Sequence, residues 1–228
     1  MSAVPTAREP LRIDFVSDIV CPWCAIGLAA LEQALARLPE NVDVEFHVRP
    51  FELNPQMAAE GEDIADHLTR KYGMSPEQLT AARANLQARG AEVGVAFGDR
   101  LRTWNTFDAH RLLHWAGLEG RQLALKHALL QAYHGDAANV ADHAVLAQIA
   151  ASVGLDAGRA ATILASDTYA AAVRNDAQRF IRSGIRSVPA IIIDQQHLIS
   201  GGQPVAVFER ALQDIVAGKA GRVIADAE

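Results

Sequence analysis

The 228-residue sequence predicts an α/β fold that is interrupted by a large all-helical insertion. Strand-like patterns occur near the two ends of the chain, at about 12–48 and 188–200, whereas residues from about 61 to 170 show only helical periodicity. Half of the residues are hydrophobic, so a sizeable core can form. We therefore expect the two ends to combine into one α/β unit around the helical segment.

The amino-terminal segment predicts a strand, a helix and a second strand. The apolar run Arg12–Val16 predicts the first strand, and leucines at a helical period predict a helix from Pro22 to Leu38, ended by Pro39. Residues 42–48 alternate apolar with polar side chains, as in a half-buried strand. A strand–helix–strand order implies a right-handed crossover and parallel pairing of the two strands.

The central segment predicts five to seven helices and no strand. Ser75-Pro76 marks a helix start with proline at the first helical position. Further helices are expected at about 104–115 and 123–133, and from the cap Asp142 to Val153. The abundance of alanine in this part of the chain also favours helix.

The carboxy-terminal segment predicts a β-hairpin and a final helix. The apolar run Val188–Asp194 predicts a strand led by a proline, and Gln195-Gln196 predicts a turn. His197–Ser200 is then its antiparallel partner. An amphipathic helix is expected over Pro204–Ala217.

The motif Cys21-Pro22-Trp23-Cys24 contains the only two cysteines of the chain. It lies between the first predicted strand and the first predicted helix, which is the sequence context of a thioredoxin-type redox site. A zinc site would normally need two more Cys or His ligands at matching spacing, and no second pair exists. Half a metal site or a structural cysteine pair remains the alternative interpretation.

The chemistry of thiol exchange explains the spacing of the two cysteines. Cys21 would lie at the helix N-cap, where unpaired N–H groups and the positive end of the helix dipole favour a thiolate. Pro22 suits the first helical position, since the N–H that it lacks would be unpaired there. Cys24, one turn further in, should be more buried. We therefore expect Cys21 to be the nucleophile and Cys24 the resolving thiol, with a mixed disulfide as intermediate.

The predicted organisation is a discontinuous thioredoxin-like domain that carries a helical domain. Residues 11–55 plus 169–217 are assigned to the thioredoxin-like domain, and residues 56–168 to the helical insertion. Residues 1–10 and 218–228 are expected to be flexible termini.

Composition and charge exclude some classes of partner. The net charge is −6 and the pI is about 5.7, whereas nucleic acids and anionic membrane surfaces select basic patches. Met1–Pro10 lacks an apolar core of signal-peptide length, and the chain has no apolar run of about 18 residues that could span a membrane. We therefore expect a cytoplasmic protein that binds neither nucleic acid nor membrane.

Several sequence blocks resemble those of DsbA-like thiol oxidoreductases of the FrnE type. The blocks occur in the same order as in that family and extend over nearly the whole chain. They are Asp14–Cys24 with Ile26-Gly27, Pro50–Pro55, Asn105–Leu112, Gly184–Pro189 and Ser200–Gln203. Cys-Pro-Trp-Cys followed far downstream by Val-Pro is the most specific feature.

The resemblance implies a substrate-binding face around the cysteines. Val188-Pro189 would be a cis peptide that faces the motif, and Val188 would offer its backbone to an extended substrate chain. A proline that merely starts an edge strand is the other interpretation. Pro22 and Trp23 lie inside the motif, and we expect Trp23 to stack on the substrate rather than only to cover Cys24.

Two polar residues are weaker candidates for substrate binding. His110 is one turn from His114, but no third ligand is evident, so we expect no metal and place His110 at the domain interface near the active-site cleft. Asn54 resembles a glutathione-contacting asparagine of kappa-class transferases. It is also explained as a turn residue before Pro55.

The expected activity is thiol–disulfide exchange, which covers protein disulfide oxidation, reduction or isomerisation. The redox-active dithiol needs no further cofactor, although glutathione is open as a co-substrate, and the partners are thiol or disulfide substrates. One alternative is a glutathione-dependent enzyme of the 2-hydroxychromene-2-carboxylate isomerase or kappa-class transferase type, in which serine stands in place of Cys21. A second alternative is a non-catalytic peptide-binding chaperone, whose activity would survive loss of both cysteines.

Overall fold

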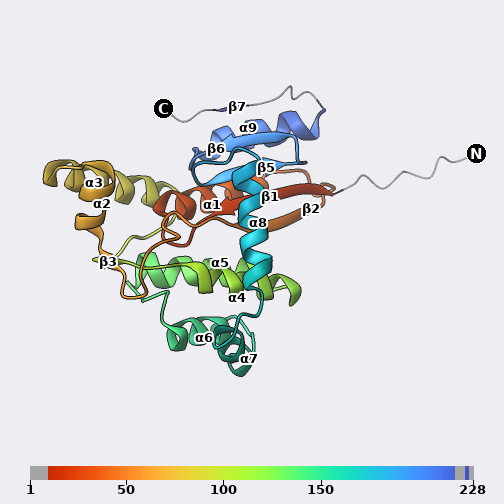
Figure 1. Cartoon of the computed structure of the whole chain (residues 1–228). Helices are drawn as coiled ribbons and strands as arrows, with labels where there is room; N and C mark the ends of the chain where they lie inside the picture. The colour runs from red at the N-terminus through yellow and green to blue at the C-terminus, as the bar shows by residue number, and fades with distance from the viewer. Residues whose placement is uncertain (1–9, 219–223, 226–228) are drawn as a thin grey trace, which may run out of the picture.

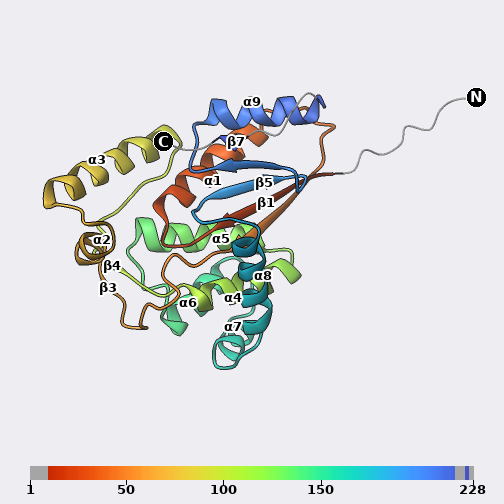
Figure 2. The same ribbon diagram turned by 45° about the horizontal axis from the view of Figure 1, so that its top comes forward.

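A computed structural model of the chain describes residues 10–218 and 224–225 (Figures 1 and 2). In chain order the elements are β1 (Leu11–Ser17), α1 (Pro22–Leu35), β2 (Val44–Pro50), β3 (Glu62–Asp63), α2 (Ile64–Tyr72), α3 (Pro76–Glu92), β4 (Arg102–Thr103), α4 (Phe107–Leu118), α5 (Gln122–Leu130), the π-helical turn η1 (Gln131–Gly135), α6 (His143–Ser152), α7 (Ala157–Leu164), α8 (Ala170–Arg182), β5 (Ala190–Ile193), β6 (His197–Ser200), α9 (Val205–Val216) and β7 (Ile224–Ala225).

The central sheet combines the two ends of the chain, as the sequence predicts. Its strand order is β2-β1-β5-β6-β7. The predicted parallel pairing of β1 with β2 is confirmed, and so is the antiparallel hairpin of β5 and β6. Helices α1 and α9 lie on one side of the sheet and α8 on the other (Figure 2). The predicted α/β class is therefore confirmed.

The alternation of side chains along β1 separates two parts of the core. Leu11, Ile13 and Phe15 point to one face and pack with residues of α1 and α9. Val16 points to the opposite face and packs with Phe180 of α8. β1 is buried on both faces. It therefore carries apolar residues on both, unlike a strand with one face in solvent.

Helices α2, α3, α6 and α7 begin at side-chain caps that the sequence carries. The Ser75 hydroxyl accepts a hydrogen bond from the Gln78 N–H while the Gln78 side chain accepts one from the Ser75 N–H, which makes a capping box at the start of α3. Asp63, Asp142 and Asp156 cap α2, α6 and α7 in the same way through their carboxylates. The helix starts predicted at Ser75 and Asp142 are confirmed.

Helices α4 to α7 share one hydrophobic cluster with the segment that precedes the cysteines. Ile19 and Val20 of the β1–α1 loop and Val48 of β2 share one hydrophobic cluster with buried residues of these helices. One continuous core thus crosses the predicted domain boundary. The division into 11–55 plus 169–217 and 56–168 remains a prediction.

Two local predictions are wrong. The predicted absence of strands in the central segment is contradicted by β3 and β4, two-residue strands that pair Glu62 with Thr103. Such pairs are too short to create an alternating pattern. The predicted turn at Gln195-Gln196 lies one residue earlier, because Asp194 and Gln195 adopt positive φ angles. Aspartate tolerates this left-handed conformation better than most residues.

The predicted flexible termini, 1–10 and 218–228, lie outside the described residues except at Pro10, Gly218 and 224–225. Ile224–Ala225 forms β7, which pairs in parallel with β6. No helix of the described residues is long and apolar enough to cross a membrane.

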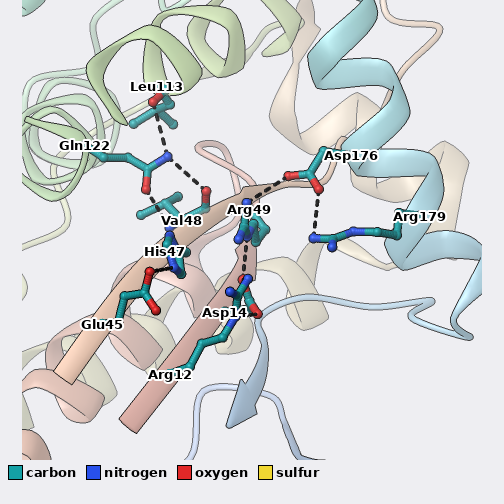
Figure 3. Close-up of polar contacts among 10 residues, drawn as sticks. All are labelled: Arg12, Asp14, Glu45, His47, Val48, Arg49, Leu113, Gln122, Asp176 and Arg179. Atoms are coloured by element: carbon teal, nitrogen blue, oxygen red, sulfur yellow. Dashed lines mark hydrogen bonds and ion pairs between the residues drawn. The ribbon is translucent and has the colours of Figure 1, made fainter. Parts of the chain in front are cut away.

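The free edge of β2 is covered by the first residue of α5 (Figure 3). The Gln122 side chain accepts a hydrogen bond from the Val48 N–H at 2.9 Å and donates to the Val48 carbonyl at 3.2 Å. It also donates to the Leu113 carbonyl in the middle of α4. An amide side chain thus takes the place of a neighbouring strand and leaves no open edge at this point.

A chain of ion pairs ties α8 to the sheet beneath it (Figure 3). The nearly buried Asp14 of β1 accepts hydrogen bonds from Arg12 and Arg49, and Arg49 also contacts Asp176 of α8. Asp176 in turn pairs with Arg179. Burial on its own would raise the pKa of Asp14, but the hydrogen bonds from Arg12 and Arg49 outweigh it and hold that pKa below its ordinary value.

We predict that Asp14→Asn lowers the free energy of unfolding by about 2 kcal/mol at pH 7, because it leaves two arginines without their shared anion. A group with a depressed folded-state pKa stabilises the fold above its unfolded-state pKa of about 4 and loses that effect as pH falls. The difference in the free energy of unfolding between variant and parent should therefore become smaller below about pH 4, as urea titrations at each pH would measure.

The matched control is Asp99→Asn, which removes an exposed carboxylate paired with Arg83. That change should alter stability by less than about 0.5 kcal/mol. Equal losses in the two variants would contradict the special role of Asp14.

Candidate dithiol site

The two cysteines occupy the amino-terminal turn of α1. Cys21 is the N-cap residue with extended backbone angles, and Pro22 takes the first helical position. Both thiols are free. The Cys24 N–H donates to the Cys21 carbonyl at 3.0 Å, so the motif itself forms the first turn of the helix. Apolar residues of α1 bury the rest of that helix against β1 and α9 and fix its direction.

The two thiols differ in their surroundings. Cys21 is 4% exposed and its thiol donates to the Val188 carbonyl, with Sγ and O 3.5 Å apart. Cys24 is fully buried. Trp23, between them, is 36% exposed and is the part of the motif most open to solvent. Access to the dithiol is therefore from the side of Cys21 and Trp23.

Electrostatics divides the roles of the thiols in the same way. A hydrogen bond from the Cys24 thiol is the main cause that holds the pKa of Cys21 below its ordinary value, against the opposing effect of burial. Backbone N–H groups of Cys24 and Trp23 lower it further. Burial raises the pKa of Cys24 well above its ordinary value, and the interaction with Cys21 adds to that rise. Cys21 is thus the thiol that ionises first.

The loop that carries Val188 and Pro189 meets α1 at Gly27, which has no side chain. A Cβ atom added to Gly27 of α1 would lie 3.0 Å from Cγ of Pro189. A Cβ atom added to Gly202 would lie 2.9 Å from the Trp23 carbonyl oxygen. Glycine at these two positions therefore allows three chain segments to converge on the motif. The Val188–Pro189 peptide bond is cis, and both residues are buried.

A buried aspartate, Asp18, lies just before the motif, and both of its carboxylate oxygens accept hydrogen bonds. The carboxylate of Asp18 accepts hydrogen bonds from the N–H groups of Ile19 and Leu53, each at 2.7 Å. His110 of α4 approaches it at 3.4 Å and hydrogen-bonds the Phe51 carbonyl at 3.1 Å. Burial would raise the pKa of Asp18, but the hydrogen bond from His110 and those from the backbone hold it below its ordinary value.

The structure also places the two polar residues that the sequence suggested for substrate binding, His110 and Asn54. His110 does reach the segment before Cys21, where it is 2% exposed and contacts Asp18. Its predicted substrate role remains a prediction. The other histidine of the pair, His114, stacks on Tyr169 instead. The amide oxygen of Asn54 accepts a hydrogen bond from Lys71, a contact consistent with a structural role in its turn. The predicted substrate role of Asn54 remains a prediction.

No group of three possible metal-ligating side chains gathers anywhere within residues 10–218 and 224–225. The sequence analysis missed two buried basic residues near the motif. Lys126 of α5 is fully buried, and its amino group has no hydrogen-bond partner among the described residues. His134 of η1 donates from Nε2 to the Ile19 carbonyl at 2.9 Å, while its Nδ1 is unpartnered in the same part of the chain. The signal in the sequence was weak: Lys126 stands between Leu123 and Leu130, where an apolar residue would continue the buried stripe.

Comparisons with known proteins agree on one family. The model of the DSBA-like thioredoxin domain matches residues 12–213. The crystal structure of the probable DsbA oxidoreductase SCO1869 from Streptomyces coelicolor is similar, with 38% identity and a TM-score of 0.87, and the match covers 95% of this chain and 94% of that one.

Two further similarities are more distant. The uncharacterized protein YwbO of Bacillus subtilis (strain 168) is 26% identical over 207 residues, which are 90% of this chain and 96% of YwbO. The structure of the cytosolic disulfide reductase DsbM from Pseudomonas aeruginosa with GSH has a TM-score of 0.60 at 17% identity, and the match covers 91% of this chain and all of that one. At that identity the likeness is one of fold.

We predict that Cys21 titrates below the value of about 8.5 for a free cysteine when its thiolate absorbance is followed against pH. Replacing Cys24 by alanine removes the thiol donor and should raise the pKa of Cys21, whereas Cys24→Ser keeps a donor and should leave it closer to that of the parent. The same Cys21 pKa in the two variants would show that the helix terminus and not the partner thiol controls it.

We also predict that Gly202→Ala lowers the free energy of unfolding by about 1–3 kcal/mol, because its Cβ atom forces the backbone at Trp23 to move. The fluorescence of Trp23 should change in the folded variant. Unaltered stability and unaltered fluorescence would show that the contact is relieved at no cost.

Proposed function

This chain belongs to the DSBA-like thioredoxin domain family, and we propose on that basis that it acts as a thiol–disulfide oxidoreductase through Cys21 and Cys24. One observation carries the proposal. A thiol with a lowered pKa lies at the amino terminus of α1 against the Val188 carbonyl, and a second thiol is buried behind it. This is the arrangement that two-step exchange requires.

The proposed reduction of a substrate disulfide proceeds in two displacements. The Cys21 thiolate attacks one sulfur of the substrate, forms a mixed disulfide and releases the other sulfur as a thiolate. Cys24 loses its proton and attacks the Cys21 sulfur. The enzyme disulfide forms, the bond from Cys21 to the substrate breaks, and the second substrate thiolate leaves. The substrate gains two electrons and the dithiol loses them, and the reverse sequence oxidises a substrate dithiol.

The proposed substrate is an extended polypeptide. Val188 and Pro189 flank Cys21, and Trp23 offers an exposed aromatic face beside them. One hollow of the structure lies between β2, α4 and α8, and another beside α1, α5 and residues 93–96. Neither is lined by Cys21 or Trp23. A substrate that lies along the surface suits this site better than one that needs an enclosing pocket.

Glutathione and a cytoplasmic location belong to the same proposal. The DsbM protein of similar fold is named a cytosolic disulfide reductase and was solved with GSH. In a reducing compartment the dithiol of this chain would be regenerated by a thiol of that class. The direction of exchange follows from the reduction potential, which titration against a glutathione buffer measures.

We predict that Cys21→Ser abolishes reduction of a peptide disulfide, because no nucleophile remains at the accessible position. Cys24→Ser should instead accumulate a covalent enzyme–peptide adduct that dithiothreitol releases, since attack proceeds and resolution does not. Mass spectrometry of the quenched reaction checks both outcomes. Full activity of Cys21→Ser would overturn the proposed function.

The double variant Cys21→Ser/Cys24→Ser is the control for the alternative functions. If it still suppresses aggregation of an unfolded protein as well as the parent does, the chaperone interpretation gains support. If the double variant still catalyses a glutathione-dependent isomerisation, the interpretation as a glutathione-dependent isomerase or transferase gains support.

A further inference from the structure

The buried amino group of Lys126 has no role in the exchange described so far. Lys126 lies in α5, more than a hundred residues from the motif, and it is fully buried without a hydrogen-bond partner among the described residues. Burying an unpaired amine costs several kcal/mol unless the group sheds its charge. A purely structural role would be filled with less loss of stability by a leucine at this position.

The packing of α5 directs Lys126 toward the first turn of α1. Leu123 and Leu130 lie on the same face of α5 as Lys126, three and four residues away. Both pack in the cluster that contains Ala25 and Leu28 of α1. The lysine thus lies between two leucines of the cluster that includes α1, and Leu130 lines one hollow together with Ala25 and Leu28.

Its electrostatic partners locate the amine more narrowly. The charges that act on Lys126 are those of Cys24, Asp18 and Cys21, with Cys24 the strongest of them. Burial lowers the pKa of Lys126, and the Lys126 charge in turn lowers that of Cys24. The two groups therefore lie close enough inside the protein for the charge of each to shift the pKa of the other.

We propose that the neutral amine of Lys126 accepts the proton of Cys24 when the mixed disulfide is resolved. The inference rests on the proposed function. The S–H bond of Cys24 breaks as an N–H bond forms on Lys126, which leaves a thiolate beside an ammonium group. The thiolate attacks the Cys21 sulfur and the substrate thiolate leaves. The extra proton then passes from Lys126 to the departing thiolate or to water.

The other titratable groups around Cys24 are poorer acceptors. The oxygens of Asp18 are held by two backbone N–H groups and by His110. The Nδ1 atom of His134 has no partner among the described residues, but burial lowers the pKa of His134 well below the ordinary value, so it is a weak base. The buried thiol of Cys24, with its raised pKa, needs a stronger base than this imidazole.

The test uses the full reduced chain and 5,5′-dithiobis(2-nitrobenzoate) in stopped flow. Attack by Cys21 releases the first coloured thiolate, and resolution by Cys24 releases the second, so the two phases separate the two steps. Absence of the first phase would contradict the proposed function, whereas the Lys126 inference concerns only the second.

We predict that Lys126→Met slows the second phase by about 100-fold or more at pH 7 and leaves the first phase nearly unchanged. The parent rate should level off with rising pH, because the amine removes the proton internally. The variant rate should keep rising, because its thiol must ionise into solvent with a raised pKa. An unchanged second phase or identical pH profiles would overturn the inference.

Two further variants exclude a role of the charge or of packing alone. Lys126→Arg keeps a positive charge but cannot give up its proton, so it should remain slow. A second phase restored by arginine would show that charge suffices and would overturn the inference. Leu130→Ala, on the same face of α5, should lower the melting temperature and leave both phases intact.

Stability gives an independent readout. Replacing an unpaired buried amine by methionine should leave the urea midpoint equal or higher while resolution slows. A lower midpoint together with a normal second phase would assign Lys126 a structural role instead.

Discussion

The convergence of three chain segments at the amino terminus of α1 is the constraint on which the site depends. Three segments come into close contact there: the motif, the Val188–Pro189 loop and the loop at Gly202. A Cβ atom at Gly202 would be too close to the Trp23 carbonyl oxygen, and one at Gly27 would be tight against Pro189, so glycine at both positions favours this convergence. The sheet supplies the frame for this contact, because β1 ends next to the motif and β5 begins next to Pro189.

The helical segment contributes to the chemistry and not only to the outline of the molecule. His110 of α4 and Lys126 of α5 both come from the predicted insertion, and both influence groups within or just before the motif. Because one hydrophobic cluster joins these helices to the β1–α1 loop, their buried polar groups are held at fixed positions. An insertion of this kind can tune the second thiol while the thioredoxin-like part presents the first.

Burial raises the pKa of both cysteines, but only at Cys21 do hydrogen bonds outweigh it, and this difference decides which thiol ionises first. Cys21 receives hydrogen bonds that compensate for its burial, whereas Cys24 is left to bear the cost of desolvation. A thiolate therefore forms first at the position near solvent. The resolving step then depends on what removes the proton from the interior, which is where a buried base becomes useful.

The sequence by itself determined the features that depend on neighbouring residues. The Cys-Pro-Trp-Cys turn at a strand–helix junction, the caps at Ser75 and Asp142, and the two clusters of strands follow from local chemistry and periodicity. It also led to the fold class, because helices between two sets of strands allow few arrangements. The short pair of β3 and β4 left no pattern, since two residues are too few to alternate.

Only the tertiary structure decided which distant groups meet. The Val188 carbonyl reaches Cys21 across 167 positions of sequence, and Gln122 replaces a strand at the edge of β2. Lys126, on another helix, is near enough for its charge to lower the pKa of Cys24. His110 shows the same limit, since its place near the motif was predicted but its burial against Asp18 was not. Such contacts depend on how whole elements pack, and a single sequence carries no local signal for that.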